Sequence, residues 1–302
     1  MNETPEGRGM GWLPDYPDFR DYTPDYGQAP PHEERAVPAL LQQVGVGEAA
    51  PTVKLSRSVD LRSGFSPVED QGRLGSCTAN AGAGVIEYFE RTAFGKHLDV
   101  SRLFLYKVTR DLMGQKGDTG AYLRTTMQAL ALFGAPPEPY WPYDVTRFDR
   151  EPTAFCYAFG GDYKALQYYR LDPPGTSPEQ LLARIKTNLA AKLPAMFGFT
   201  VYSSYAQADA TGAFPFPATG ENKVGGHAIV AAGYDDAKVI RNTNPGGPET
   251  RGALLIRNSW GPTWGEQGYG WLPYEYVLKG LADDWWSVLK ADWVDTGAFG
   301  PT

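Results

Sequence analysis

The hydrophobic pattern of this chain changes from helical to strand-like near residue 164, and no other feature limits the fold as strongly. Before that point, apolar residues recur at helical spacing and predict three helices, at Cys77–Thr92, Ser101–Leu112 and Ala121–Leu132. After it, short apolar runs between turns predict strands at Lys164–Leu171, Ala195–Tyr202, His227–Gly233, Ala253–Ile256 and Ser287–Val294. One amphipathic helix interrupts them at Pro178–Leu193, with Ser177 as its N-cap.

This order of elements predicts an α+β fold with two lobes. The expected helical lobe covers roughly residues 57–160, and the expected β lobe covers roughly residues 161–302. A cleft between two such lobes is the natural place for an active site.

Residues 1–56 differ in character from the rest of the chain. They show no sustained helical or strand period, only Ala39–Val44 has the pattern of a short helix, and prolines stand at positions 5, 14, 17, 24, 30, 31, 38 and 51. We therefore expect an extended arm, and its aromatic segment from Trp12 to Tyr22 is expected to pack on the body. The favoured hypothesis is a pro-segment that crosses and blocks the cleft; the alternative is a permanent brace on the back of the fold.

The composition excludes several classes of partner and membrane segment. The net charge is -7 and no run rich in Lys or Arg is present, so nucleic acid and anionic membranes are not expected as partners. No segment has the length of apolar sequence that a transmembrane helix needs. The first 19 residues lack the basic and apolar regions of a Sec signal peptide, so we expect a protein that is cytoplasmic or exported without a cleavable leader. A monomer is expected.

The sequence contains only two cysteines, Cys77 and Cys156, which favours a reduced protein over a disulfide framework. Cys77 stands where a glycine-containing loop meets a predicted helix, and the positive end of a helix dipole favours a thiolate there. The alternative for any cysteine is a small buried apolar residue. We assign that alternative to Cys156, because no motif accompanies it.

Three further residues have the types that would complete a thiol active site. His227 opens an apolar strand that would carry its ring into the cleft as a general base for Cys77, whereas His32 and His97 lie in polar or proline-rich surroundings and are interpreted as exposed or structural. Asn258 would orient the imidazole, with Trp260 and Trp264 shielding their hydrogen bond from water. Gln71 would form an oxyanion hole together with the backbone N–H of Cys77.

The type, order and local setting of these residues resemble the papain-like cysteine peptidases over residues 58–294. The resemblance rests on Gln71 with Gly75-Ser76-Cys77, on Gly226-His227-Ala228, and on Asn258-Ser259-Trp260-Gly261. The separation of Cys77 and His227, 227 − 77 = 150 residues, agrees with the family's range of about 130–150. The resemblance implies the two-lobed papain-like fold, with an antiparallel, barrel-like β lobe, and cysteine-type peptidase activity.

The chain departs from the family pattern at several positions, and its disulfide-free core, its N-terminal arm and its absent leader resemble the disulfide-poor bacterial branch. Leu74 and Asp118 stand where cysteines are usual, and Thr78 replaces an aromatic residue. The stretch from His227 to Asn258 is long, and Arg241–Arg251 has the appearance of an inserted loop.

The resemblance also implies a substrate site for a peptide or protein. Gly75, Ser76 and Gly120 would line the substrate backbone, with Gly226 and Trp260 also in the site. The pocket for the side chain two residues before the cut, here called the specificity pocket, would be lined by Tyr122, Leu123, Gly198 and Ala228. This mostly apolar lining predicts a hydrophobic or aromatic preference.

Two alternative functions remain open at this stage. One is a thiol-dependent acyl transferase or deamidase on the same scaffold, and the other is a catalytically silent binding protein of this fold. No metal-ligand cluster, phosphate-binding loop or dinucleotide fingerprint is visible in the sequence, so neither a metal nor a cofactor is expected.

Overall fold

The computed structural model describes residues 7–18, 21, 23, 37–47, 55–161 and 167–301. The other parts of the expected arm, including His32, and residues 162–166, which include the start of the strand expected at 164–171, lie outside the described residues.

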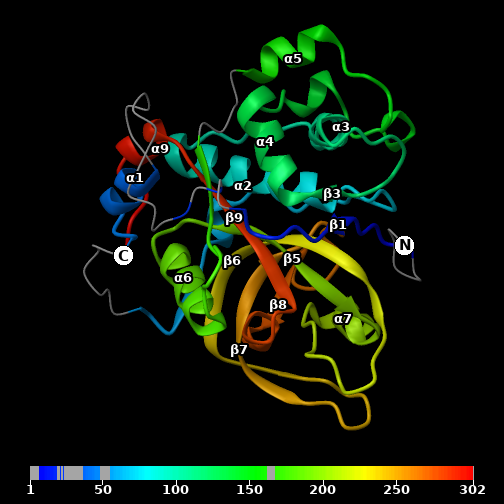
Figure 1. Ribbon diagram of the computed structural model, residues 1–302, viewed down its shortest axis with the longest axis vertical. Coiled ribbons are helices and arrows are strands. Elements are labelled where there is room, and N and C mark those ends of the chain that lie inside the picture. The colour runs from blue at the N-terminus through cyan, green and yellow to red at the C-terminus, as the bar shows by residue number, and fades with distance from the viewer. Residues whose placement is uncertain are drawn as a thin grey trace.

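The upper half of the molecule is helical (Figure 1). Its central helix, α2 (Cys77–Phe94), ends at Gly95, whose φ of 67° is a left-handed conformation that favours glycine. Around it lie α3 (Arg102–Leu112), α4 (Leu123–Phe133) and α5 (Ala154–Gly160). Short 3₁₀ turns occur at Arg62–Gly64, Glu138–Tyr140 and Val145–Arg147.

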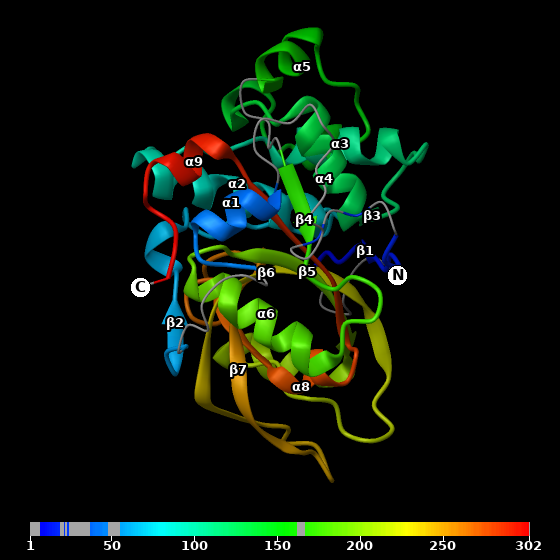
Figure 2. The ribbon, with the colours of Figure 1, turned by 60° about the vertical axis from the view of Figure 1, so that its left-hand side comes forward.

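The lower half is built on an antiparallel sheet (Figures 1 and 2). Its strands follow the order β4 (Gln167–Arg170), β9 (Ala282–Leu289), β5 (Ala195–Tyr202), β6 (Lys223–Arg241), β7 (Glu249–Arg257) and β8 (Tyr269–Pro273), and β2 (Ser58–Asp60) also pairs with β6. Helices α6 (Pro178–Ala190), α7 (Ala208–Thr211) and α8 (Tyr274–Leu278) and the 3₁₀ turn Ser203–Gln207 accompany the sheet. The fold is therefore α+β, with the helical and antiparallel sheet regions of the two-lobed papain fold.

Most of the elements expected from the sequence are confirmed. The strand at Ala195–Tyr202 is found with the expected limits, and the expected helices differ by one to three residues at their ends. Ser177 caps α6 as expected, because its side chain accepts a hydrogen bond from the backbone N–H of Gln180.

One expected strand is wrong at its end, and one expected loop is shorter than predicted. The strand expected at Ser287–Val294 ends at Leu289, and Ala291–Asp295 forms helix α9, because Trp293 turns back and stacks on Phe89 of α2 at 4.8 Å. The loop expected at Arg241–Arg251 is found at residues 242–248, and its flanks are the paired ends of a hairpin, with Arg241 of β6 opposite Glu249 of β7.

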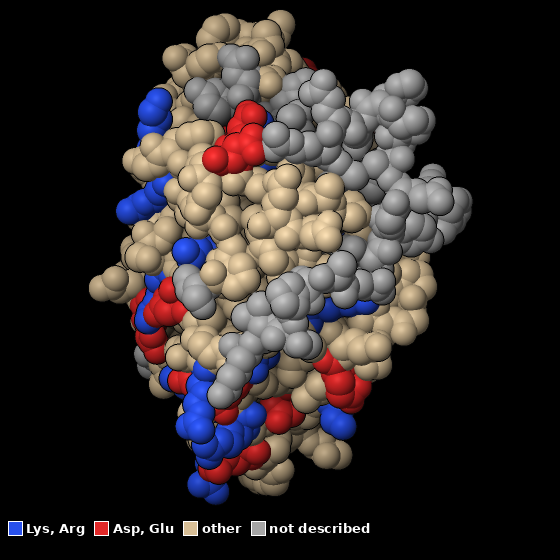
Figure 3. Space-filling view, turned by 90° about the vertical axis from the view of Figure 1, so that its left-hand side faces the viewer, with Lys and Arg blue, Asp and Glu red and all other residues tan. Residues whose placement is uncertain are grey.

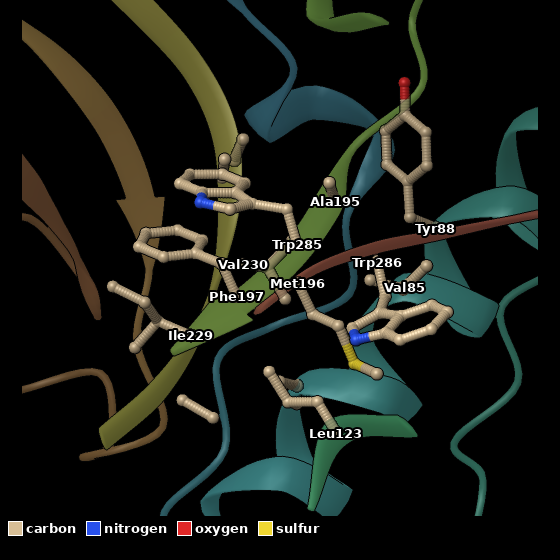
Figure 4. Close-up of a cluster of buried hydrophobic side chains, with 14 of the residues drawn as sticks. Val85, Tyr88, Leu123, Ala195, Met196, Phe197, Ile229, Val230, Trp285 and Trp286 are labelled. Atoms are coloured by element: carbon tan, nitrogen blue, oxygen red, sulfur yellow. The ribbon is translucent and has the colours of Figure 1, made fainter. Parts of the chain in front are cut away.

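The core joins the two lobes through large side chains (Figure 4). The ring of Trp285 on β9 stacks on that of Phe197 on β5 at 3.9 Å and 7°. Leu123 of α4 reaches the same region as Met196 of β5 and Trp286 of β9, and all three side chains are buried. Burial of aromatic and aliphatic surface from both lobes therefore holds the two halves together.

The N-terminal segment runs between the two halves. Strand β1 (Trp12–Leu13) pairs in parallel with β3 (Ala121–Tyr122). Helix α1 (Val37–Gln43) lies beside α9 on another side of the molecule (Figure 2). The arm therefore contacts the body at two separate places.

The described surface carries mixed charge. On the face shown in Figure 3, basic and acidic side chains intermingle over the lower half, and uncharged residues occupy much of the middle. In the described ranges, no helix is both long enough and apolar enough to span a bilayer.

Candidate active site

The thiol of Cys77 stands at the first turn of α2, at the inner end of the loop 71–76. Ser76, just before the helix, is held from two sides: its hydroxyl is 2.6 Å from the hydroxyl of Tyr143, and its carbonyl accepts from the Asn80 amide at 3.0 Å. The Tyr143 hydroxyl also donates to the Gln71 carbonyl at 3.0 Å. The loop therefore presents Cys77 from a fixed backbone.

Asp118 ties this loop to the loop that carries Gly120. Its carboxylate accepts from the Gly75 backbone N–H at 3.0 Å and from the Tyr106 hydroxyl at 2.5 Å. The same hydroxyl accepts from the Gly120 N–H at 3.1 Å. At a position where the family usually has a disulfide cysteine, this chain links the two loops by hydrogen bonds.

His227 and Asn258 come from neighbouring strands and meet directly. His227 lies within β6, and Asn258 directly follows β7. The Nε2 atom of His227 is 2.8 Å from the Oδ1 atom of Asn258, and the Trp260 ring stacks on the imidazole at 4.8 Å and 22°. The Nδ1 atom of His227 has no hydrogen-bond partner within the described part of the chain.

Gln71 lies where the Cys77 loop meets the segment after β7. Its side-chain oxygen accepts from the Ser259 hydroxyl at 2.5 Å, and its backbone N–H donates to the Ser259 carbonyl at 2.9 Å. Its amide nitrogen donates to the Leu74 carbonyl at 2.8 Å, which uses one of its two hydrogens. The second hydrogen remains for another acceptor.

Burial suppresses ionisation of the Cys77 thiol and of the His227 imidazole. Removal from water raises the pKa of the Cys77 thiol to about 12, although hydrogen bonds from the backbone of Ala228, Thr78 and Trp12 oppose the shift. Burial likewise lowers the pKa of His227 to about 4, against the opposing effect of its hydrogen bond to Asn258. In this conformation the thiol and the imidazole are therefore both neutral near pH 7.

The N-terminal arm lies across the site in an extended conformation, and the Trp12 backbone contacts the Cys77 thiol. The Gly9 N–H donates to the Gly72 carbonyl at 2.7 Å, and the Gly9 carbonyl accepts from Trp260 Nε1 at 3.2 Å. Further along, the Gly11 N–H donates to the Gly226 carbonyl at 3.2 Å, and the Ala121 N–H donates to the Gly11 carbonyl at 2.8 Å. The arm therefore bonds to both walls of the cleft.

Trp12 fills the place expected for the specificity pocket. A Cβ on Gly198 would come 1.9 Å from the indole ring, and a Cβ on Gly226 would come 2.7 Å from the Trp12 carbonyl. The indole N–H donates to a carboxylate oxygen of Asp284 at 3.1 Å. Of the other residues expected in the pocket, Leu123 and Ala228 are buried and Tyr122 is partly exposed.

Ionic contacts hold the arm on either side of Trp12. Arg8 pairs with Asp209 and lies over the Trp260 ring, 5.1 Å from its centre. Past Trp12, Arg124 of α4 pairs with both Asp15 and Asp21.

Sequence reasoning missed Asp284, Arg124 and Asp209. One signal for Asp284 was present in the sequence: an acidic residue stands directly before the apolar pair Trp285-Trp286. Because a charged side chain is seldom buried without a partner, an acidic residue in such a strand marks a candidate functional position. No sequence pattern could have paired Arg124 or Asp209 with the arm, because these contacts link residues about a hundred or more positions apart.

Known proteins resemble this chain over nearly its whole length. The model of the papain family of cysteine proteases matches residues 55–281. An uncharacterized peptidase C1-like protein of Acanthamoeba polyphaga mimivirus is 30% identical, over 95% of this chain and 89% of its own length. Chymopapain from Carica papaya is 27% identical over 70% of this chain, which spans 53% of chymopapain.

Among solved structures, xylellain, a cysteine protease from Xylella fastidiosa, superposes with a TM-score of 0.71. It is 32% identical, and the match covers 94% of this chain and 97% of xylellain. The family match and these two long alignments agree with the fold. The chain belongs to the papain family of cysteine proteases and is a cysteine-type peptidase.

Proposed function

We propose that this peptidase cleaves peptide bonds with Cys77 as nucleophile, His227 as general acid and base, and Asn258 as the residue that orients the imidazole. The observation that carries the proposal is the 2.8 Å contact between His227 Nε2 and Asn258 Oδ1, covered by Trp260. It commits one ring nitrogen to the amide and leaves Nδ1 for the thiol proton.

The proposed reaction is acyl transfer through a thioester. The Cys77 proton moves to His227, and the sulfur attacks the peptide carbonyl carbon while the carbonyl electron pair moves to oxygen. The free hydrogen of the Gln71 amide and the Cys77 N–H stabilise that oxyanion. His227 then protonates the leaving amine, and water activated by His227 hydrolyses the thioester and restores the thiol.

Labelling with an epoxide inhibitor of thiol peptidases tests the assignment of the nucleophile. We expect Cys77→Ala to lose both peptide hydrolysis and labelling, and the control Cys156→Ala to keep both. Labelling of Cys156 alone would contradict the proposal.

We also propose that the arm inhibits the enzyme in place. In the proposed register, a substrate runs in its N-to-C direction from the specificity pocket toward Trp260, because the pocket holds a side chain that precedes the cut. The arm runs the opposite way, from Gly9 beside Trp260 to Trp12 in the pocket. A segment bound in the reverse direction occupies the cleft without presenting a correctly oriented peptide bond to Cys77.

Substitution of Trp12 in the full-length chain tests this inhibition. Trp12→Ala removes the largest contact of the arm in the pocket and is expected to speed epoxide labelling of Cys77 at least tenfold. Deletion of residues 1–56 separates inhibition from bracing: an inhibitory arm predicts a folded and more active product, and a brace predicts an unfolded one.

The specificity pocket is proposed to take a hydrophobic or aromatic side chain. The flat space between Gly198 and the opposite wall holds the Trp12 ring, which supports this preference. A panel of fluorogenic dipeptides tests it, and a preference for Arg or Glu at that position would contradict it.

A further inference from the structure

The specificity pocket contains a buried carboxylate, that of Asp284. The residue is wholly buried and lies on β9, where the register against β5 shifts between Met196 and Gly198. Its φ of 63° is a left-handed conformation that few residues other than glycine, asparagine and aspartate adopt readily. A bulge of this kind redirects a side chain, and here the carboxylate points at Trp12.

The two oxygens of this carboxylate have different partners. Oδ1 accepts from Trp286 Nε1 at 2.6 Å and lies 3.2 Å from a guanidinium nitrogen of Arg170. Oδ2 accepts from Trp12 Nε1 at 3.1 Å. The bond to Oδ1 comes from within β9, whereas the bond to Oδ2 comes from the arm. When the arm leaves, Oδ2 loses this donor while the carboxylate stays at the bottom of the pocket.

An unpaired carboxylate oxygen in a buried site carries a free-energy cost, because it has lost water without gaining a hydrogen-bond donor. A substrate side chain that restores the hydrogen bond avoids this cost, and one of equal shape without a donor does not. Sites built to hydrogen-bond a substrate N–H therefore discriminate strongly against analogues that lack it.

Building on the proposed peptidase function, we propose that Asp284 is the specificity-determining residue of this pocket. It selects an aromatic side chain with an N–H donor at its far edge, that is tryptophan, two residues before the cut. The arm residue Trp12 occupies the pocket as a mimic of that side chain.

The surroundings favour an indole over a cation. Glycines at 198 and 226 leave a space for a flat ring, because a Cβ at either position would overlap Trp12. Arg170 already lies against Asp284 and is shared with Asp172, whose carboxylate is 3.0 Å from Arg170 Nε. A substrate guanidinium would stand close to that of Arg170, whereas a neutral indole N–H satisfies Oδ2 without adding charge.

The test uses the full-length chain with Trp12→Ala, so that the pocket is vacant. Two fluorogenic peptides differ only two residues before the cut: one has tryptophan and the other has 3-benzothienylalanine, in which sulfur replaces the N–H. We expect kcat/KM to be about 10- to 100-fold higher for tryptophan, after active sites are titrated with the epoxide. Equal rates, or a faster reaction with a matched arginine peptide, would overturn the inference.

Two variants that suit the left-handed backbone at 284 serve as a matched pair. In Asp284→Asn the amide oxygen stays with the donors Trp286 and Arg170 at the Oδ1 position, so its NH2 group faces the pocket and most of the preference should be lost. Asp284→Gly removes the acceptor and is expected to bring the ratio close to one, while benzothienylalanine is still cleaved. An unchanged ratio in a folded Asp284→Gly variant would contradict the proposal.

Failure of this inference is distinguishable from failure of the proposed function. Hydrolysis of both peptides without discrimination overturns only the role of Asp284, whereas no hydrolysis of either peptide or of casein overturns the peptidase assignment as well.

A measurement without substrate tests the hydrogen bond between Trp12 and Asp284. The substitution Trp12→Phe should speed Cys77 labelling when Asp284 is present and have little effect with Asp284→Gly. Equal acceleration in both backgrounds would contradict the role of the indole N–H.

Discussion

The indole ring of Trp12 lies against the backbone of Gly198 so closely that a Cβ on this glycine would come 1.9 Å from the ring. The first prediction follows from this contact. In the full-length chain, Gly198→Ala should push Trp12 out of the pocket, because inserting a methyl into a packed site costs about 1–3 kcal/mol. Labelling of Cys77 should then accelerate by roughly 5- to 100-fold, as measured by mass spectrometry.

The matched control is the same substitution in the Trp12→Ala background. With the ring absent, the new methyl has nothing to displace, so no further acceleration is expected. A slower or unchanged rate in the Gly198→Ala single variant would contradict the contact as a determinant of closure.

The second prediction concerns the ionic contacts that hold the arm after Trp12. The Arg124 side chain is 15% exposed and pairs with Asp15 and Asp21 of the arm. Arg124→Ala should weaken closure by about 1.4 kcal/mol and speed Cys77 labelling about tenfold, since charge-assisted hydrogen bonds of this kind contribute about 1.5–3 kcal/mol. The control is Arg62→Ala, which breaks exposed pairs with Asp60 and Glu266 and should leave labelling unchanged.

The third prediction is a pH profile. In the closed conformation the pKa of Cys77 is raised to about 12 and that of His227 is lowered to about 4, both by burial. Between these values the pair is neutral, so alkylation of closed enzyme by iodoacetamide should rise about tenfold per pH unit from pH 6 to 9. In Trp12→Ala, where water reaches the site, a thiolate–imidazolium pair should give a plateau extending to lower pH. The same profile in both proteins would contradict burial by the arm as the cause.

The sequence allowed the fold class, the helices and the pairing of chemistry-bearing residues to be predicted, because these depend on local patterns and on residue types in a fixed order. Cys77 at a helix start and the Asn258-Ser259-Trp260-Gly261 segment can be recognised as motifs in the sequence. The end of β9 was mispredicted because apolar residues recur as far as Val294, and only tertiary packing of Trp293 against Phe89 decides that this end forms a helix.

The arm illustrates what sequence patterns cannot reach. Its aromatic content indicated packing on the body, but not which glycines would make room for Trp12. The carboxylate beneath the ring depends on a left-handed backbone at Asp284 and on a register shift between two strands. These features arise from pairing between distant segments, so they became visible only in three dimensions.

The fourth prediction separates binding of the oxyanion from activation of the thiol. Gln71→Ala should lower kcat by about 10²–10³-fold, the usual loss for one oxyanion-hole donor. The rate of iodoacetamide alkylation of Cys77 should stay within about threefold in the Trp12→Ala background, because alkylation by this reagent generates no oxyanion. Cys156→Ala is the control for reagent consumed elsewhere. A parallel loss of alkylation would instead indicate that Gln71 acts through the loop it shares with Ser259.

The fifth prediction concerns Asp118, which links the nucleophile loop to the loop of Gly120 by accepting from Gly75 and Tyr106. Asp118→Ala leaves both donors without this acceptor, so we expect a loss of about 1–3 kcal/mol in the free energy of unfolding and a lower kcat. Tyr106→Phe removes only one of the two donors and should cost less on both measures. Chemical denaturation and peptide hydrolysis, both in the Trp12→Ala background, give the two readouts. An Asp118→Ala variant as stable and as active as its parent would show that the loops hold their positions without this carboxylate.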